Sequence, residues 1–423
     1  MAAMVMCGDW LVTVSGKTLT AVHTRESREA FVLDCSAVEQ TEKQTTTPAT
    51  HSKDDKDDKD ADDGGGAAGD GILAVAASAS GRLVAVTDDR KRLILLSTQP
   101  AWSVLSCRCV VRRCTALAFS RDEECVWAAD KSGDVYSFPS SHTHTHTHTH
   151  TPGTLQLGHL SMLLALVVSP DDRFVITADR DEKIRVSLKA ATHNIQAYCL
   201  GHTQFVSCLF LPPCCPDRLL SGSGDGLVML WEYSTGRRLQ SLDMREIHQQ
   251  PEDERLCVRR ISSSTDGKHL AVLCDGLPRL QLFAMTSDKA TPTQSLPLPS
   301  TPRDTTFDLQ GRLWILLDDT HTPAVLYTHT GDSWEQCDAG QPDLKRVTDV
   351  LTKHNLPLPG VCVSQLYKVA FDNTATYRQR KEERLQKTEL NTNTNTKAKA
   401  KASPQRNGAK RPRHTHQTPP SNA

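Results

Sequence analysis

The chain has 423 residues and a formal net charge of −1, so the molecule as a whole is neither a polycation nor a polyanion. Its 14 cysteines contain no pair of CxxC motifs at zinc spacing. The N-terminal apolar run contains Asp9 and has no basic leader, and the central apolar stretch from Leu160 to Ser169 is too short to span a bilayer. These features argue against a secreted, zinc-finger or membrane protein, and we expect a soluble intracellular protein with reduced thiols.

The N-terminal region reads as β-structure followed by a segment that cannot fold. Residues 10–23 alternate apolar and polar around a Ser–Gly turn, which predicts a β-hairpin, and Phe31 to Leu33 predict a further strand. Residues 40–70 are almost free of apolar side chains and dense in Asp and Lys. We expect a disordered, solvated loop there, with an acidic partner site as the less favoured alternative.

Two stretches then share a strand–turn–strand–turn–strand layout, at residues 71–97 and 114–138. A simple His-Thr repeat from His142 to His150 comes next. Alternating histidines can chelate metal, but a low-complexity connecting loop is the favoured interpretation. Two clearer repeats, residues 158–187 and 201–233, each open on Gly-His, and two more come after them at residues 258–285 and 305–327.

The repeat at residues 201–233 carries the most complete pattern. Its Gly-His opening, turn Asp and closing Trp resemble one WD repeat, a four-stranded blade of a β-propeller. In such blades His202, Ser221 or Ser223, Asp225 and Trp231 can form a hydrogen-bonded chain that holds the strands in register. We therefore assign these residues a structural role and no chemistry.

The repeat before it has the same opening but an incomplete pattern. His159 matches His202, and Asp181 falls at the position of Asp225, so both are predicted to be structural. Ser187 stands where the closing Trp would be, which leaves the hydrogen-bonded chain of this blade incomplete.

Together these repeats account for six blades. Residues 360–371 are expected to supply part of a seventh, completed by the N-terminal strands, because propellers often close by pairing an N-terminal strand with the last blade. The sequence thus predicts an all-β, seven-bladed WD-repeat β-propeller over residues 1–372, which includes the acidic insert and the His-rich loop.

Residues 373–423 change character. The good helix formers and interleaved charges of residues 373–390 predict a short basic helix, and a disordered, basic, low-complexity tail comes after it. Lys410 to Arg413 (KRPR) fits a nuclear import signal or a phosphate-binding tether. We expect the protein in the nucleus, with the cytoplasm left open as a second compartment.

Signatures of catalysis are missing from the sequence. It contains no HExxH, GxSxG, GxxxxGK[ST] or protein-kinase set. The glycine-rich turn from Gly222 to Gly226 continues into a strand and lacks the helix N-terminus that would hold a phosphate. We expect a non-enzymatic interaction platform without catalytic residues, cofactor or metal.

The most unusual surface is a group of three cations, Arg180, Lys183 and Arg185. Lys183 and Arg185 are two residues apart on a predicted strand and therefore share a face, and Arg180 precedes the turn. Such a group can bind carboxylates of a partner or phosphates of RNA. The alternative is that these are ordinary solvated strand positions.

A family resemblance appears in the stretches SPDDRFVITADRDEKIRVS, CLGHTQFVSCLF and LLSGSGDGLVMLWEY. They resemble the WD-repeat non-catalytic subunit of the tRNA (guanine-N7)-methyltransferase. The similarity is dense from Leu160 to Tyr233, weaker but collinear in the other blades, and absent from the acidic, His-rich and tail segments.

The resemblance implies a seven-bladed propeller that binds a separate catalytic subunit as a heterodimer. That subunit holds S-adenosylmethionine and methylates N7 of a guanine in the tRNA variable loop, while the propeller stabilises it and helps position the tRNA. Carried over by motif, the partner-binding residues are Arg180, Lys183 and Arg185.

We further expect basic residues of the C-terminal helix to lie near the tRNA backbone and to add salt-dependent affinity. These are Arg378, Arg380, Lys381, Arg384 and Lys387. Two alternatives remain: a generic WD-repeat scaffold for a ubiquitin-ligase or chromatin complex without an RNA role, and, with least support, a propeller enzyme.

Overall fold

The computed structural model describes residues 4–39, 71–140, 153–251, 254–331, 333–354, 363–368, 377–378 and 380–382. The chain divides into two units, Met1–Tyr367 and Lys368–Ala423, which are described separately. The predicted acidic insert at residues 40–70 and the His142–His150 run lie outside the described residues.

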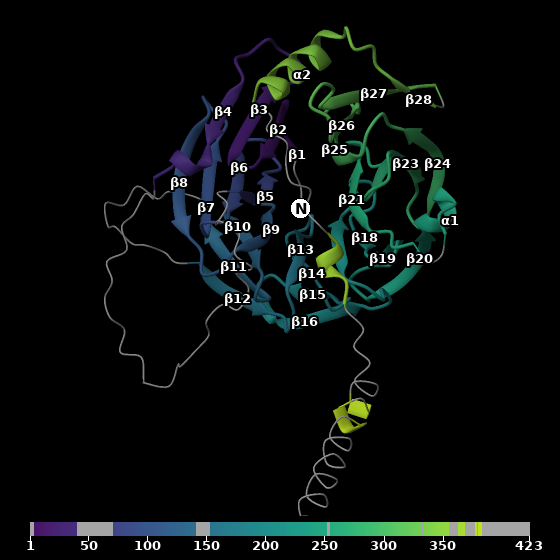
Figure 1. The fold of residues 1–423 in the computed structure, drawn as a ribbon. Coiled ribbons are helices and arrows are strands. Elements are labelled where there is room, and N and C mark those ends of the chain that lie inside the picture. The colour runs from purple at the N-terminus through teal and green to yellow at the C-terminus, as the bar shows by residue number, and fades with distance from the viewer. Residues whose placement is uncertain are drawn as a thin grey trace, which may run out of the picture. The chain divides into compact units, whose positions relative to one another are not determined.

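The first unit is a closed ring of seven antiparallel sheets (Figure 1). Over the described residues each sheet has four strands, and in each the strands come in sequence order from the centre outwards. The prediction of a seven-bladed β-propeller is thereby confirmed. We number the sheets as blades 1 to 7 in chain order.

Blades 1 to 4 have the following strands: β1 (Met4–Cys7), β2 (Trp10–Ser15), β3 (Thr18–His23) and β4 (Phe31–Asp34); β5 (Ile72–Ala77), β6 (Leu83–Asp88), β7 (Arg92–Ser97) and β8 (Ser103–Cys109); β9 (Cys114–Phe119), β10 (Cys125–Asp130), β11 (Asp134–Pro139) and β12 (Thr154–Gly158); β13 (Leu163–Val168), β14 (Phe174–Asp179), β15 (Ile184–Leu188) and β16 (Ala191–Cys199). Blades 5 to 7 have these: β17 (Val206–Phe210), β18 (Arg218–Ser223), β19 (Leu227–Glu232) and β20 (Arg237–Asp243); β21 (Val258–Ser263), β22 (His269–Cys274), β23 (Arg279–Met285) and β24 (Ala290–Pro297); β25 (Pro302–Phe307), β26 (Leu313–Leu317), β27 (Ala324–Thr330) and β28 (Ser333–Gln336).

The middle strands of each blade are buried on both faces because neighbouring blades pack face to face. Every residue of β14 is buried, whereas the outermost strand of the same blade, β16, leaves five of its nine side chains exposed. This explains why the middle strands read as continuous apolar runs, with Val, Ile and Leu that suit a doubly covered strand, and not as alternating ones.

The ring closes differently from the sequence prediction. The N-terminal segment forms a complete blade of its own, β1 to β4, and blade 7 is complete with β25 to β28. No strand is exchanged between these two blades among the described residues. The expectation that N-terminal strands complete the last blade was therefore wrong. At the inner rim, the Met4 amide donates to the Asp304 carboxylate over 2.9 Å, which ties β1 to β25.

A helix that the sequence analysis missed covers this joint. Helix α2 (Pro342–His354) comes after blade 7 and packs against β3 and β27 (Figure 1). Its buried face, Leu344, Val347 and Leu351, shares a core with residues from both blades. Arg346 donates to the backbone carbonyls of His23 and Thr24 at 3.1 and 3.2 Å. The packing of α2 and the hydrogen bonds from Arg346 thus close the ring, in place of the strand exchange that the sequence predicted.

Residues 360–371 also differ from expectation. The described part of this stretch contains no strand; it forms a 3-10 turn, η2 (Val363–Leu366), followed by Tyr367. A second short helix, α1 (Met244–His248), comes after blade 5 and is capped by the Asp243 carboxylate. Neither segment has the two-residue periodicity that marks strands, and their positions depend on contacts with distant residues.

Candidate interaction surfaces

Blade 5 contains a complete hydrogen-bonded chain. His202 contacts the Asp225 carboxylate through Nδ1 at 2.9 Å and the Ser221 hydroxyl through Nε2 at 2.7 Å, and the Trp231 indole donates to Ser221 at 2.8 Å. Ser221, not Ser223, is the hydroxyl in the chain. Burial acts to raise the pKa of the Asp225 carboxyl, but the hydrogen bonds from His202 and two backbone amides outweigh it, and the pKa is lowered.

Blade 4 uses a different carboxylate from the one expected. His159 contacts Asp179 Oδ2 at 2.9 Å and Thr177 Oγ1 at 2.7 Å. Asp181 lies at the turn position of Asp225, but Asp179 is the carboxylate that His159 contacts. The reason is geometric: Asp179 ends β14, and its second oxygen accepts the Lys183 amide at 3.0 Å, which closes the turn.

The same turn-closing hydrogen bond from a backbone amide to an Asp carboxylate occurs in three consecutive blades. Asp88, Asp130 and Asp179 are each the last residue of the second strand, and each accepts the backbone amide of the residue four positions later. In blade 5 the equivalent residue is Ser223, and the Asp comes two residues later. The repeated Thr-Asp or Ala-Asp at the end of an apolar run is the sequence signal that identifies Asp179.

The three predicted partner-binding cations do not form one surface cluster. Arg185 is half-buried on β15, where Nε donates to Ser187 Oγ at 2.9 Å and the two terminal nitrogens donate to the carbonyls of Gly158 and Thr192 at 3.1 and 2.9 Å. It thereby connects blade 3 with blade 4, and its hydroxyl partner is the Ser187 that replaces the closing Trp.

Lys183 lies just before β15 in the turn, and its side chain is exposed. Its ammonium group donates to the Asp181 carbonyl at 3.2 Å. Several large apolar side chains are exposed on or next to β12 and β16, the outermost strands of blades 3 and 4. These are Leu155, Leu160, Ile195, Tyr198 and Leu200, with exposed fractions of 42% to 108%. Single exposed apolar residues are ordinary, but several on neighbouring strands suggest a contact surface.

The pairing of strands β15 and β16 places some of these apolar residues next to Lys183 and Arg185. Ile184 pairs with Cys199 and Arg185 pairs with Tyr198, so Lys183 and Leu200 each adjoin the same strand pair, at its end. Leu160 comes directly after His159, whose imidazole is held by Asp179. We call Lys183 with Leu160, Tyr198 and Leu200 the blade 4 patch. The sequence analysis found its lysine but missed its apolar members, because alternation along β12 and β16 does not reveal which strand is outermost.

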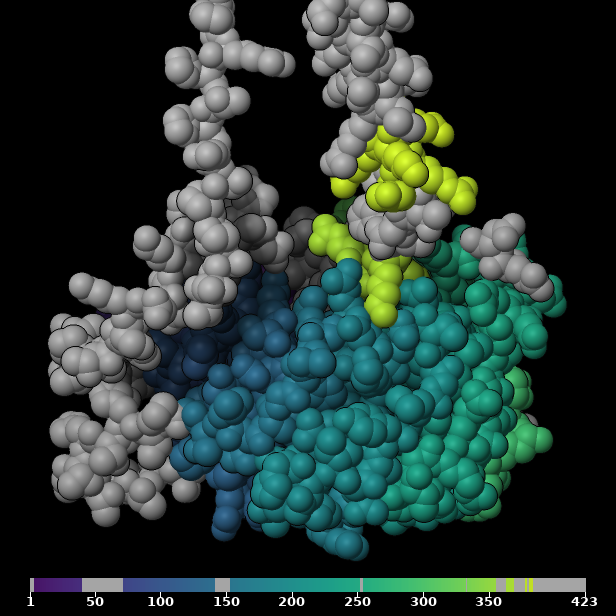
Figure 2. Space-filling view, turned by 90° about the horizontal axis from the view of Figure 1, so that it is seen from below, coloured from purple at the N-terminus to yellow at the C-terminus, as the bar shows by residue number. Residues whose placement is uncertain are grey.

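Arg180 faces the C-terminal part of the first unit. Its Nε donates to the Leu366 carbonyl at 3.0 Å, and a terminal nitrogen donates to the Gln365 carbonyl at 3.3 Å. Figure 2 shows residues 363–367, in yellow-green, lying against the teal surface of the propeller. We call residues 363–367 the strap.

Tyr367 holds the end of the strap. It is 9% exposed, its hydroxyl donates to the Gly224 carbonyl at 3.0 Å, and its ring makes an edge contact with Phe205 at a centroid distance of 5.0 Å. The Arg255 guanidinium lies 4.8 Å from the ring centroid on blade 6's side. Burial raises the pKa of the Tyr367 hydroxyl to about 12. Gly224 is needed here, since an added Cβ would lie 2.4 Å from the Phe205 ring.

The predicted tRNA-proximal residues belong to the second unit. Arg378, Arg380 and Lys381 are in helical conformation and exposed, whereas Arg384 and Lys387 lie outside the described residues. The described part of this helix therefore offers three cations to solvent.

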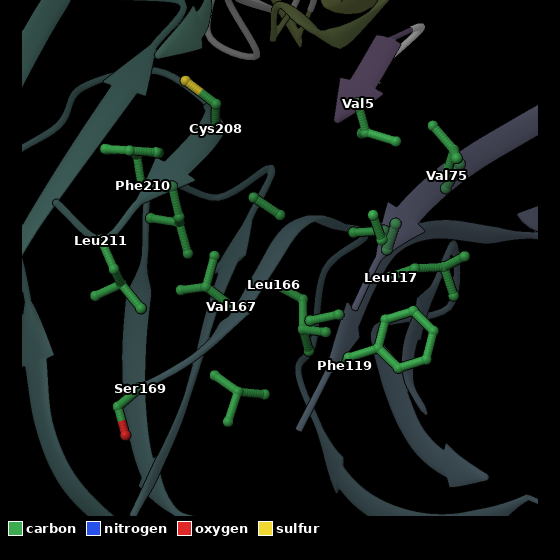
Figure 3. A pocket seen from close by; sticks show the side chains of 18 of the residues that line it. Val5, Val75, Leu117, Phe119, Leu166, Val167, Ser169, Cys208, Phe210 and Leu211 are labelled. Atoms are coloured by element: carbon green, nitrogen blue, oxygen red, sulfur yellow. The ribbon is translucent and has the colours of Figure 1, made fainter. Parts of the chain in front are cut away.

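A cavity of about 640 Å³ lies within the ring and is lined by the innermost strands of several blades (Figure 3). Its walls are largely apolar, with side chains such as Val75, Leu166 and Phe210 pointing inwards. Two of its hydroxyls link adjacent blades: Thr115 donates to the Leu163 carbonyl, and Ser207 donates to the Val258 carbonyl. Three arginines, Arg121, Arg259 and Arg260, also line the cavity, but among the described residues its lining includes no Asp, Glu or His that would act as a general acid or base beside them.

No three His, Cys, Asp or Glu side chains of the described residues are arranged to hold a metal ion. No helix within the described ranges is long and apolar enough to cross a membrane. Burial raises the pKa of several thiols, Cys114 and Cys199 to about 12, which makes them poor nucleophiles.

Comparison with known proteins identifies the family. The family model of the tRNA methyltransferase TRM82 WD40 domain matches residues 10–153 and 142–336. A Danio rerio protein named tRNA (guanine-N(7)-)-methyltransferase non-catalytic subunit wdr4 is 48% identical over 395 residues, which cover 91% of this chain and 92% of that protein. A Homo sapiens protein with the corresponding name is 41% identical over 389 residues, 89% of each chain.

Among solved structures, a chain in the crystal structure of the mitotic checkpoint complex superposes with a TM-score of 0.57 over 75% of this chain and 84% of that chain. At 12% sequence identity this similarity concerns the propeller fold alone. The family model and the relatives carry the assignment further: the chain belongs to the TRM82 WD-repeat family, whose members include the non-catalytic subunits of tRNA (guanine-N7)-methyltransferase.

Proposed function

We propose that this chain binds and stabilises the S-adenosylmethionine-dependent catalytic subunit of a heterodimeric tRNA (guanine-N7)-methyltransferase, and helps position tRNA for N7-methylguanosine formation in the variable loop. The names of its relatives support a non-catalytic role beside a methyltransferase. The structural observation that supports it best is the blade 4 patch, which joins an exposed lysine to exposed apolar side chains on a rigid propeller.

The composition of the patch suits a protein partner. Leu160, Tyr198 and Leu200 supply apolar area, which provides most of the affinity in protein interfaces once it is buried. Lys183 at the edge provides charge selectivity toward an acidic residue of the catalytic subunit. Arg185 contributes indirectly, because its hydrogen bonds to Gly158 and Thr192 hold β15, where it pairs with Tyr198, against β12 and β16.

Charge reversal at Lys183 tests this placement. Lys183→Glu should reduce co-purification of the catalytic subunit at least tenfold while the propeller stays folded, because the residue is exposed. Lys268→Glu is a matched control, since its side chain is 74% exposed on blade 6. Equal recovery of the catalytic subunit with both variants would contradict the placement.

Apolar members of the patch need a separate variant. Leu200→Ser should also weaken the heterodimer, because Leu200 is 62% exposed and its removal opens little core. Mass spectrometry of the proteins retained by the wild-type chain identifies the partner. Recovery of ubiquitin-ligase or chromatin components in place of a methyltransferase would support the scaffold alternative.

The tRNA contact is assigned to the basic C-terminal region. Lys and Arg residues that neutralise phosphates release counterions, so the contact should weaken steeply with salt. Replacing Arg378, Arg380 and Lys381 with alanine should lower the affinity of the reconstituted heterodimer for tRNA and leave heterodimer formation intact. Unchanged tRNA affinity at low salt would remove this region from the RNA contact.

Nuclear localisation is a further part of the proposal and rests on the sequence from Lys410 to Arg413. Replacing Lys410 and Arg411 with alanine should shift a fluorescently tagged chain toward the cytoplasm. An unchanged nuclear signal would show that this segment is not required for import.

A further inference from the structure

The strap is attached to the propeller through several side-chain contacts. Its backbone is held by Arg180 at two carbonyls, and its last side chain, Tyr367, is seated between Phe205, Arg255 and the Gly224 carbonyl. The hydrogen bonds among these contacts join residues that are 143 to 186 positions apart in the chain.

The region C-terminal to the strap is strongly basic. From Lys368 to the end, the sequence contains Lys and Arg at thirteen positions and Asp and Glu at four, although the whole chain has a net charge of −1. The attachment at Tyr367 therefore sets the point at which this cationic region leaves the propeller. Without it, the next described attachment would be at His354, the end of α2, and the tether would be longer by residues 355–367.

We propose that Arg180 and Tyr367 are positioning residues that anchor the basic C-terminal region on blades 4 and 5, and that this anchor increases the affinity of the heterodimer for tRNA. The inference rests on the proposed function, in which this region contacts tRNA. It also gives Arg180 a different role from direct partner binding, because its guanidinium is already directed at the strap carbonyls.

The physical basis is effective concentration. A cationic segment attached close to bound tRNA meets the phosphates at a local concentration that falls with the length of the tether, roughly as its −3/2 power. Releasing the strap lengthens the tether, while every Lys and Arg remains present. The anchor thus changes affinity without changing how many phosphate contacts form once tRNA is bound.

Salt titration separates the anchor from the contacts. The slope of log K against log salt reports the number of neutralised phosphates, at about −0.7 to −0.9 per contact. A chain ending after Tyr367, reconstituted with the catalytic subunit, should lose affinity for tRNA and show a shallower slope. Tyr367→Ala and Arg180→Ala should each weaken binding by about three- to tenfold at an unchanged slope.

Controls distinguish the anchor from general damage. Arg173→Ala removes an arginine from the same blade, but its side chain is 70% exposed and far from the strap in the strand register, so it should leave tRNA affinity unchanged. Tyr367→Phe keeps the ring contacts and should have a smaller effect than Tyr367→Ala. In methylation assays the anchor variants should raise KM for tRNA with kcat nearly unchanged.

Each result has a distinct consequence. If the truncated chain binds tRNA with wild-type affinity and slope, the proposed tRNA contact of the C-terminal region fails. If truncation weakens binding but Tyr367→Ala and Arg180→Ala do not, the contact stands and the anchor is overturned. A third result is that Arg180→Ala preparations lose the catalytic subunit while Tyr367→Ala preparations keep it. That result would show that Arg180 binds the partner directly, and it would also overturn the anchor.

Discussion

The imidazole of His159 lies between the Asp179 carboxylate at 2.9 Å and the Thr177 hydroxyl at 2.7 Å. Burial acts to raise the pKa of Asp179, but the hydrogen bonds from His159 and the Lys183 amide outweigh it, and the pKa is lowered. The carboxylate is therefore ionised at neutral pH, and it joins the start of blade 4 to the turn that carries Lys183.

We expect Asp179→Asn to destabilise the propeller by about 2 kcal/mol, because a buried charged hydrogen-bond acceptor loses its charge while its donors remain. Asp349→Asn, at an exposed position of α2, should change the free energy of unfolding by less than about 0.5 kcal/mol. Urea unfolding followed by tryptophan fluorescence measures both. A loss for Asp179→Asn no larger than that for Asp349→Asn would contradict the role given to Asp179.

Arg185 should affect stability as well as partner binding. Arg185→Ala leaves the carbonyls of Gly158 and Thr192 without their donor, and we expect a loss of about 2 kcal/mol in the free energy of unfolding. Arg185→Lys should restore little, since an ammonium group cannot reproduce the planar fork that reaches three acceptors. Lys183→Ala provides the matched exposed control and should leave the unfolding midpoint unchanged. Equal unfolding midpoints for Arg185→Ala and Lys183→Ala would refute this role.

Helix α2 should determine how firmly the ring is closed. Val347 is fully buried between blades 1 and 7, and Val347→Ala should cost about 2 kcal/mol through lost burial and the cavity left behind. Hydrogen exchange should increase first at β3 and β27, the strands that α2 contacts. Lys345→Ala, at an exposed position of the same helix, should have no such effect. Exchange that increases uniformly around all seven blades would argue against a local joint.

His248 should make the propeller sensitive to mild acid. Burial and the nearby Arg279 lower its pKa from 6.5 to about 4, and its Nε2 has no hydrogen-bond partner among the described residues. The unfolded chain therefore takes up the proton first as the pH falls. The stabilisation is complete above about pH 6.5 and is lost progressively down to about pH 4, by up to about 3 kcal/mol.

The measurement is the free energy of unfolding as a function of pH for the wild type and His248→Leu. Asp179 and Asp225, whose pKa values are also lowered, lose their contribution at lower pH in both proteins, so the difference between the two curves isolates His248. The wild-type curve should fall relative to the His248→Leu curve as the pH falls from 6.5 toward 4. Parallel curves over that range would exclude His248 as the source.

Much of the fold could be predicted from local patterns. Apolar runs broken by Asp and Gly turns located six blades, because strand burial and turn chemistry depend on neighbouring residues. The Gly-His opening, Asp225 and Trp231 also indicated the hydrogen-bonded chain of blade 5. The cations at Arg180, Lys183 and Arg185 were visible in the sequence, but their different environments were not.

Residue order alone was enough for the blade type, the repeat positions and the family resemblance carried by the stretch from Leu160 to Tyr233. Three-dimensional packing was needed to see that Asp179 and not Asp181 holds His159, that α2 closes the ring, and that Arg180 holds the strap while Lys183 remains exposed. Strand patterns are set by residues a few positions apart. A hydrogen-bond partner across a blade, or a segment seated on residues more than a hundred positions away, depends on how the blades pack around the ring, and that information is absent from any local pattern.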